Sequence, residues 1–262
     1  MKYKNLIISV LFLSVFSITF SQEIEIYPDK RKRSEIRKNK KALKFYSNEI
    51  DKNRSDSISK MYYERGRAKG KLGDFKGARE DFSKAIEIDS TNANFFIRRG
   101  IANEFLKEFK SAINDYLIAS KIEPKNKDVY YGLGNSYLHI KDYENALLNY
   151  TKQINIIPKD YGSYTNRGAC YYYLSQYEKT ISDMNSSIEI KSDEKLNYYY
   201  LAKSYLELNK PEIVIKHVNN AIKLDPKNGE YYYIRAQAKL LLNMDKKATQ
   251  DFEKASKLGY IN

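Results

Sequence analysis

Internal repetition with a period of 34 residues is the feature that most limits what this chain can fold into. Small residues that would let two helices pack closely recur at this spacing: Gly66, Gly100, Gly134, Gly168, Ala202 and Ala236. Twelve residues after each comes a second, mostly small residue: Ala78, Ala112, Ala146, Thr180, Val214 and Ala248. One helix pair cannot bury its own apolar face, so a fixed period of this length with two helical segments is typical of a stacked solenoid.

Six copies of the repeat follow one another without an insertion. Their predicted limits are residues 59–92, 93–126, 127–160, 161–194, 195–228 and 229–262. Prolines close three of them, at Pro124, Pro158 and Pro226, where a helix cannot continue. We therefore expect an all-α fold in which residues 59–262 form one elongated stack of helix–turn–helix repeats.

This pattern resembles the tetratricopeptide repeat (TPR) family. The resemblance rests on the series of small and large residues and on the first large position of each repeat: Tyr62, Phe96, Tyr130, Tyr164, Tyr198 and Tyr232. Tyrosine or phenylalanine stands there where the family often has tryptophan. The resemblance implies a right-handed α-solenoid over residues 59–262, whose first helices line a concave face. It says little about function, because one scaffold can host many roles.

Four repeats carry an arginine directly before the small residue and an aspartate sixteen residues later. These are Arg65 with Asp81, Arg99 with Asp115, Arg167 with Asp183, and Arg235 with Asp251. The two repeats without the arginine, which have Leu133 and Leu201 instead, also lack the aspartate. A buried charge without its partner is costly. We therefore predict ion pairs that tie the two helices of a repeat together, with a structural rather than a catalytic role.

The N-terminus has the pattern of a secretory signal peptide. Residues 1–5 are positively charged, residues 6–20 are apolar or small, and the chain becomes polar after Ser21. We predict cleavage near Ser21 and export to the periplasm or the exterior. The alternative is that residues 6–20 stay as a membrane anchor, although such a span needs about 20 residues.

Residues 22–58 are expected to form a polar and basic leader. Within it, Ser34 could cap a helix over residues 35–51 that covers the first repeat, since the end of a solenoid must be closed. Residues 30–44 hold nine basic residues against one glutamate, in a chain of net charge +13. This segment supports an alternative function, binding of a polyanion or an anionic membrane surface. Nucleic acid is not the expected partner.

Residues typical of catalysis or metal binding are scarce. His139 and His217 are the only histidines and fall in different repeats, and Cys170 is the only cysteine. A zinc site needs several such ligands and a disulfide needs two cysteines. We predict that Cys170 is buried, and that the protein is not an enzyme and needs no cofactor or metal.

The concave face implied by the resemblance offers a candidate binding groove. Aromatic residues three positions before the small residue would form a wall, continued by two neighbouring tyrosines: Tyr63, Tyr131, Tyr199, Tyr233, Tyr172 and Tyr173. The position after the small residue adds polar groups: Arg67, Asn135, Lys203 and Gln237. Arg67, Asn135 and Lys203 lie in alternate repeats, unlike the consecutive repeats of the family's carboxylate clamp.

Tyrosine combines a large area with a polar tip, which suits recognition. We therefore predict a groove centred on Tyr131, Asn135, Tyr199 and Lys203 that binds an extended or helical peptide. Ordinary packing between helices is the alternative explanation of these tyrosines. The expected function is a protein–protein interaction scaffold or adaptor of the cell envelope. Glycan binding on exposed tyrosines is a third class.

Overall fold

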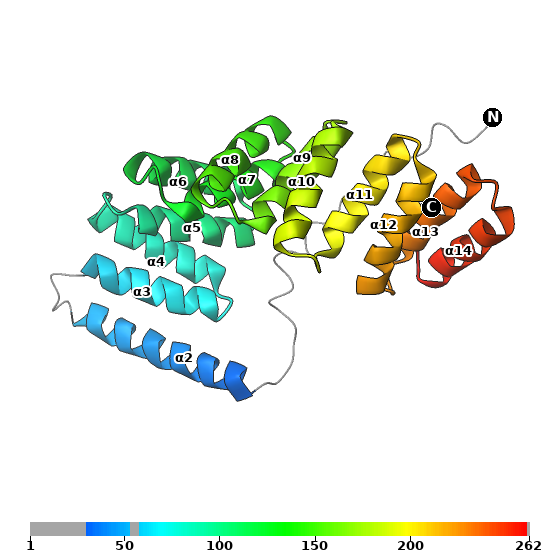
Figure 1. The fold of residues 1–262 in the computed structure, drawn as a ribbon. Coiled ribbons are helices and arrows are strands. Elements are labelled where there is room, and N and C mark those ends of the chain that lie inside the picture. The colour runs from blue at the N-terminus through cyan, green and yellow to red at the C-terminus, as the bar shows by residue number, and fades with distance from the viewer. Residues whose placement is uncertain (1–29, 53–57, 261–262) are drawn as a thin grey trace. The chain divides into compact units, whose positions relative to one another are not determined.

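Every regular element among the described residues, 30–52 and 58–260, is an α-helix in the computed structural model (Figure 1). The predicted all-α solenoid class is confirmed. The predicted signal peptide, residues 1–21, lies outside the described residues. The helices are α2 (Lys30–Asp51), α3 (Ile58–Lys71), α4 (Phe75–Ile88), α5 (Ala93–Phe105), α6 (Phe109–Ile122), α7 (Lys127–His139), α8 (Tyr143–Ile156), α9 (Tyr161–Tyr173), α10 (Tyr177–Ile190), α11 (Lys195–Glu207), α12 (Pro211–Leu224), α13 (Gly229–Leu241) and α14 (Asp245–Lys257).

The helices fall into two compact units. The N-terminal unit, residues 1–90, contains α2 to α4, and the C-terminal unit, residues 91–262, contains α5 to α14. Within each unit, every helix packs against the next helix of the chain. This consecutive packing is the arrangement expected of stacked repeats. The boundary after Ser90 falls two residues before the end of the first predicted repeat, residues 59–92.

Helix α2 begins earlier than the sequence suggested. It starts at Lys30, so Ser34 is an exposed residue inside the helix and the prediction that it caps the helix is wrong. Lysine and arginine favour helical backbone, which accounts for the extension through residues 30–33. One face of α2 is buried or half-buried, with Asn39, Leu43 and Tyr46 at helical spacing. The helix packs against α3.

The small residues at the start of the repeat pattern allow the paired helices to approach closely. A Cβ atom added to Gly134 would lie 2.5 Å from the ring of Tyr150 on α8, and one added to Gly100 would lie 3.0 Å from Tyr116 on α6. Both tyrosines are fully buried. The rings therefore occupy the space that a larger residue would need, which explains the strict register of the small positions.

The turn inside each repeat places one residue in the left-handed backbone conformation. These residues share one register: Gly73, Lys107, Lys141, Ser175, Asn209 and Asn243. Side-chain caps then start two of the following helices, α4 and α8. Asp74 accepts a hydrogen bond from the Gly77 backbone N–H at 2.9 Å, and Asp142 accepts one from Asn145 at 3.1 Å. Such caps satisfy backbone donors that the helix itself leaves free.

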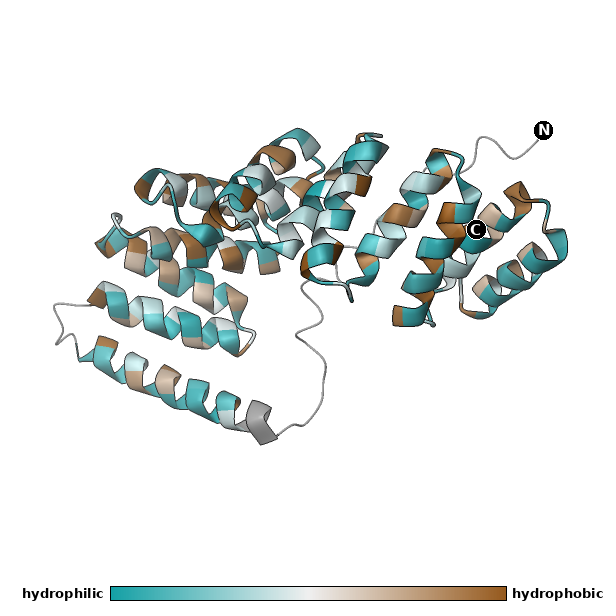
Figure 2. Ribbon diagram, viewed as in Figure 1, coloured by the Kyte–Doolittle hydropathy of each residue, from teal (hydrophilic) through white to brown (hydrophobic). Residues whose placement is uncertain are grey.

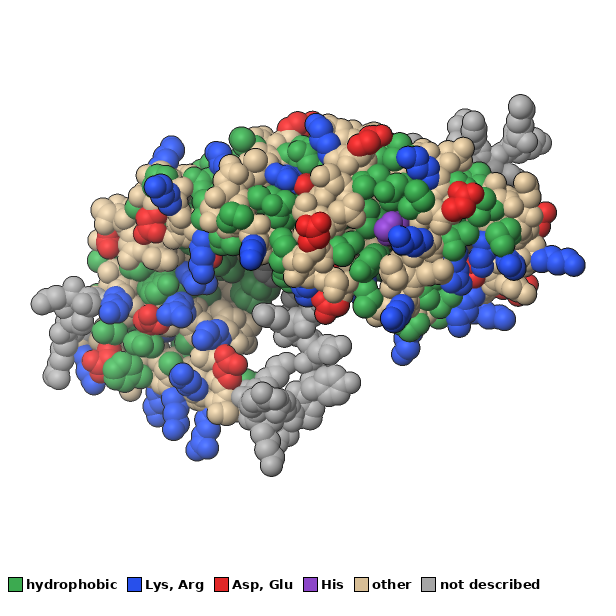
Figure 3. All heavy atoms as spheres, in the orientation of Figure 1, with side chains coloured by type: hydrophobic (Ala, Val, Ile, Leu, Met, Phe, Trp, Pro, Cys, Tyr) green, Lys and Arg blue, Asp and Glu red, His purple; other side chains and the backbone are tan. Residues whose placement is uncertain are grey.

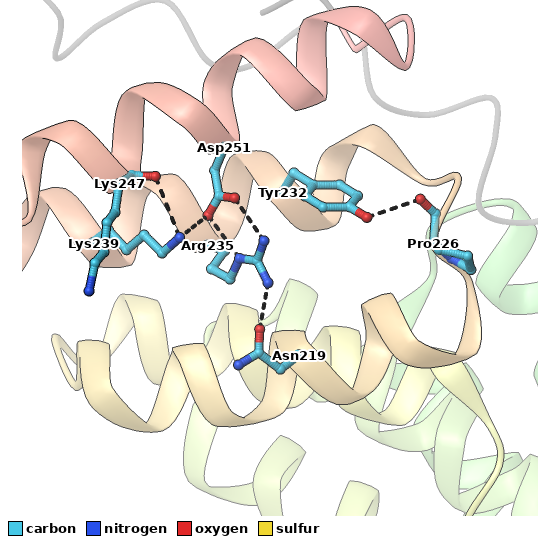
Figure 4. Close-up of polar contacts among 7 residues, drawn as sticks. All are labelled: Asn219, Pro226, Tyr232, Arg235, Lys239, Lys247 and Asp251. Carbon is cyan, nitrogen blue, oxygen red and sulfur yellow. Dashed lines mark hydrogen bonds and ion pairs between the residues drawn. The ribbon is translucent and has the colours of Figure 1, made fainter.

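All four predicted arginine–aspartate pairs are present, in Arg65–Asp81, Arg99–Asp115, Arg167–Asp183 and Arg235–Asp251. In the last repeat, Arg235 donates from Nε and Nη2 to the two carboxylate oxygens of Asp251 at 2.8 and 2.7 Å (Figure 4). Lys239 donates to the same carboxylate at 2.6 Å. Burial raises the pKa of Asp251, but its bonds and charges from Arg235 and Lys239 together lower it below the ordinary value.

Arginines of these pairs also connect neighbouring repeats. Arg235 donates from Nη1 to Asn219 on α12 at 2.7 Å (Figure 4), and Arg167 donates to Thr151 on α8 at 3.1 Å. The guanidinium of Arg235 lies 5.2 Å from the ring centre of Tyr232. Arg235 therefore forms an ion pair within its own repeat, a cation–π contact on its own helix and a hydrogen bond to the second helix of the preceding repeat.

Hydrophobic and hydrophilic residues alternate along the helices (Figure 2), as amphipathic helices require. Cys170 is fully buried, as predicted, and burial raises the pKa of its thiol. Among the described residues, none of the helices combines the length and apolar character needed to cross a membrane. The apolar run at residues 6–20 is not among them.

Candidate functional site

The candidate site is the inner face of the C-terminal unit, meaning the surface formed by the first helices of its repeats, α5, α7, α9, α11 and α13. Each of these helices contacts the next first helix as well as its own partner. Among the described residues, the second helices of this unit make no such contact with one another; they are α6, α8, α10, α12 and α14. The first helices therefore lie on the inner side of the stack, as the resemblance implied.

Two of the ten predicted groove residues belong to the N-terminal unit. Tyr63 packs against Phe82 with ring centres 5.9 Å apart, and the guanidinium of Arg67 lies 5.6 Å from the ring centre of Tyr63. Arg67 also forms an ion pair with Glu64 at 3.1 Å. These contacts lie within α3 and α4 of the N-terminal unit, whereas the other eight residues belong to the C-terminal unit.

Tyr131 and Asn135 on α7 take part in a hydrogen-bonded group that joins three helices. The buried Asn135 side chain accepts from the Tyr150 hydroxyl on α8 at 2.7 Å and from Asn166 on α9 at 3.1 Å. Asn166 also donates to the half-buried Tyr131 hydroxyl at 3.4 Å. Burial raises the pKa of Tyr131 to about 12. Asn135 is therefore buried and is linked to the Tyr131 hydroxyl through Asn166.

Lys203 on α11 lies between two tyrosine rings. Its Nζ is 5.0 Å from the ring centre of Tyr172 and 5.2 Å from that of Tyr199, distances typical of cation–π contacts. Lys203 donates to the Tyr199 hydroxyl at 3.2 Å, and that hydroxyl donates to Glu230 on α13 at 2.8 Å. Burial lowers the pKa of the half-buried ammonium, while the charges of Glu230 and Glu207 partly oppose this effect.

The ammonium of Lys203 has no carboxylate within ion-pair distance among the described residues. A lysine ammonium can donate three hydrogen bonds, and only one donor is used here. Tyr172 is half-buried and Tyr199 is buried, with 5% of its surface exposed. The group therefore presents one tyrosine ring and a cation with free donors, while Tyr199 belongs to the core.

The remaining predicted residues also pack against other rings. Tyr173 stacks on Tyr143 of α8 with ring centres 5.2 Å apart and lies 3.3 Å, oxygen to oxygen, from the Tyr200 hydroxyl. Tyr233 packs against Phe252 and Tyr260 at 5.4 and 5.1 Å. Gln237 is half-buried on α13. Sequence reasoning missed the partners Tyr143, Asn166 and Glu230, because each comes from a neighbouring repeat.

A buried carboxyl group lies elsewhere in the same unit. Glu104 on α5 is 9% exposed and accepts hydrogen bonds from Ser136 on α7 at 2.8 Å and from Tyr116 on α6 at 2.9 Å. Burial raises the pKa of Glu104 to about 7, although the two hydrogen bonds act in the opposite direction. Glu104 is thus held between three helices by neutral donors.

The described residues contain no group of three or more His, Cys, Asp or Glu side chains arranged to hold a metal ion. The imidazole of His139 stacks on Phe109 at 4.2 Å and that of His217 stacks on Tyr205 at 5.5 Å. Burial lowers the pKa of both histidines. The inner face offers rings, the Lys203 ammonium and hydrogen-bonding groups, which suit the binding of another molecule.

The tetratricopeptide repeat model matches residues 59–92 and 127–160, which are the first and third predicted repeats. Residues 59–92 and 127–160 are tetratricopeptide repeats. No curated protein matches it.

Several solved structures share the TPR architecture. MamA from Desulfovibrio magneticus RS-1 is 18% identical with a TM-score of 0.61, covering 64% of this chain and 94% of MamA. YrrB, described as a TPR protein with an unusual peptide-binding site, is 18% identical with a TM-score of 0.60, covering 68% and 91%. A TPR protein from Parabacteroides merdae ATCC 43184 is 17% identical with a TM-score of 0.62, covering 88% and 94%. At these identities the likeness shows the fold alone.

Proposed function

We propose that this TPR protein is a non-enzymatic scaffold of the cell envelope that binds a segment of another protein on the inner face of its C-terminal unit. The observation that carries the proposal is the ammonium of Lys203, held between Tyr172 and Tyr199 with donors to spare. A half-buried cation with unused donors favours a partner that supplies an acceptor, such as a carboxylate or a backbone carbonyl.

The surrounding rings define the rest of the partner. Tyr131, Tyr172 and Tyr173 are half-buried on neighbouring first helices, so their rings and hydroxyls can contact an apolar or aromatic side chain of a peptide. Asn135 and Tyr199 hold these side chains in place instead of contacting the partner. The peptide-binding site of YrrB supports peptide binding as one use of this fold. The predicted signal peptide, residues 1–21, supports an envelope location.

A pull-down from an extract of the source organism's envelope tests the binding face. Lys203→Met keeps an unbranched chain between the rings but removes the charge, and Tyr172→Ala removes one ring. We expect a partner captured by the native protein to be lost by both variants. Lys216→Met, at an exposed position on α12, is the matched control and should keep the partner.

Loss of the partner in Lys216→Met as well, or its retention in both inner-face variants, would place recognition on another surface. Circular dichroism of all variants checks that they remain folded. The location is tested separately. N-terminal sequencing of protein recovered from cell fractions should find a chain that begins at Gln22 outside the cytoplasm. An uncut chain in the membrane fraction would instead support the anchor.

A further inference from the structure

The face of α2 that points away from α3 is strongly basic. Its exposed positive side chains are Arg37, Lys38, Lys40, Lys41 and Lys44. None of them has an ion-pair partner among the described residues, whereas Lys52 at the end of the helix is paired with Glu49 at 2.9 Å. In Figure 3 lysine and arginine side chains gather along the outer edge of α2. The charge of this face is therefore open to an external partner.

Two large apolar side chains are exposed on the same helix. Phe45 is 55% exposed and lies one turn after Lys41, and Ile36 is 39% exposed. Single exposed apolar residues are common on protein surfaces. Here, however, the phenylalanine lies within the arc of the helix that carries Arg37, Lys38 and Lys41, since these residues are eight, seven and four positions away. A basic helix that also exposes an aromatic ring is suited to the interface of a membrane.

We propose that α2 docks the protein on the surface of a bilayer containing anionic phospholipids. The basic side chains would lie against lipid phosphates, and the Phe45 ring would enter the headgroup region. A soluble polyanion satisfies the charges but offers no apolar layer for Phe45. The inner face of the C-terminal unit takes no part in this docking.

Vesicle binding tests the proposal directly. The protein is used from residue 22 onward, so that every described helix is present and residues 6–20 cannot enter the bilayer themselves. We expect binding to vesicles of phosphatidylcholine mixed with phosphatidylglycerol, weaker binding at high salt, and none to phosphatidylcholine alone. Lys41→Glu combined with Lys44→Glu should weaken binding at least about twentyfold, since each basic side chain near such a surface contributes roughly fivefold.

Two further variants separate this docking from a general charge effect. Lys71→Glu combined with Lys76→Glu changes the same net charge at exposed positions of the same unit and should bind like the native protein. Phe45→Ser should weaken vesicle binding about tenfold, the effect of one ring that leaves water. Circular dichroism checks that each variant keeps its helices.

Three results would overturn the proposal. One is equal binding to both kinds of vesicle, and another is an equal loss in the Lys71→Glu, Lys76→Glu control. The third is vesicle binding that does not change in Phe45→Ser, together with equally tight binding of double-stranded DNA. That result would make a soluble polyanion the partner of α2.

Discussion

Raising the pH through the range in which Glu104 loses its proton is expected to destabilise the folded protein. The carboxyl group of Glu104 is buried between α5, α6 and α7, and its two hydrogen-bond donors, Ser136 and Tyr116, are neutral hydroxyls. Desolvation disfavours the charged form and raises its pKa from 4.5 to about 7. The protonated carboxyl group fits this environment, because the hydroxyls can accept a hydrogen bond as well as donate one.

The sign and the size of the effect follow from this pKa. Between pH 4.5 and about 7 the folded protein holds a proton on Glu104 that the unfolded chain has released. The free energy of unfolding therefore falls as the pH rises through this window. A pKa difference of about 2.5, at 1.36 kcal/mol for each pH unit, corresponds to roughly 3 kcal/mol. The contribution is fully present below pH 4.5 and is lost above about pH 7.

Urea unfolding followed by circular dichroism measures this effect. Glu104→Gln imitates the neutral carboxyl group and cannot ionise, so the difference between the native protein and this variant cancels all other titrations. We expect the variant to gain about 3 kcal/mol relative to the native protein between pH 4.5 and about pH 8. Glu144→Gln, at an exposed position on α8, is the control. A difference for Glu104→Gln that does not change with pH would refute the reasoning.

The same unfolding assay tests two other polar groups. Arg167→Leu leaves the buried Asp183 carboxylate unpaired and should cost about 3 kcal/mol. Adding Asp183→Asn copies the natural combination of Leu133 with Asn149 and should recover most of that loss; no recovery would contradict a role limited to pairing. Asn197→Ala removes a fully buried amide that bonds side chains on α9 and α10 and should cost about 2 kcal/mol, while a loss below about 0.5 kcal/mol would show that the network is not needed.

Features that recur with the 34-residue period could be predicted from the sequence. The arginine–aspartate pairs are the best example, because Leu133 and Leu201 replace the arginine only where the aspartate is also absent. Such linked changes indicate contact, since either charge alone would be costly. The close approach at Gly134 could also be predicted, because a small residue recurs at this register in every repeat. Each repeat samples the same geometry, so six copies constrain one position together.

The buried carboxyl of Glu104 was missed although the sequence contains its signal. It stands four residues after Gly100, and the same register holds Leu138, Leu206 and Leu240 in other repeats. A charged residue at an otherwise apolar register indicates either exposure or burial with partners. Its partners, Ser136 and Tyr116, come from the next repeat and from the second helix of its own repeat. Single positions of this kind depart from the repeat, and the period alone therefore does not predict them.

The candidate site shows where the repeat pattern stops being informative. Tyr172 and Tyr199 both belong to the predicted aromatic wall, yet Tyr172 is half-buried and Tyr199 is core. The difference arises at the junction between repeats, because Glu230 of the following repeat accepts the hydrogen bond from the Tyr199 hydroxyl. The register of Glu230 is not constant, since the other repeats hold Lys60, Asn94, Asp128, Gly162 and Leu196 there. Exposure along the aromatic wall therefore differs from one junction to the next, which makes Tyr172 and Lys203 better candidates for partner contact than Tyr199.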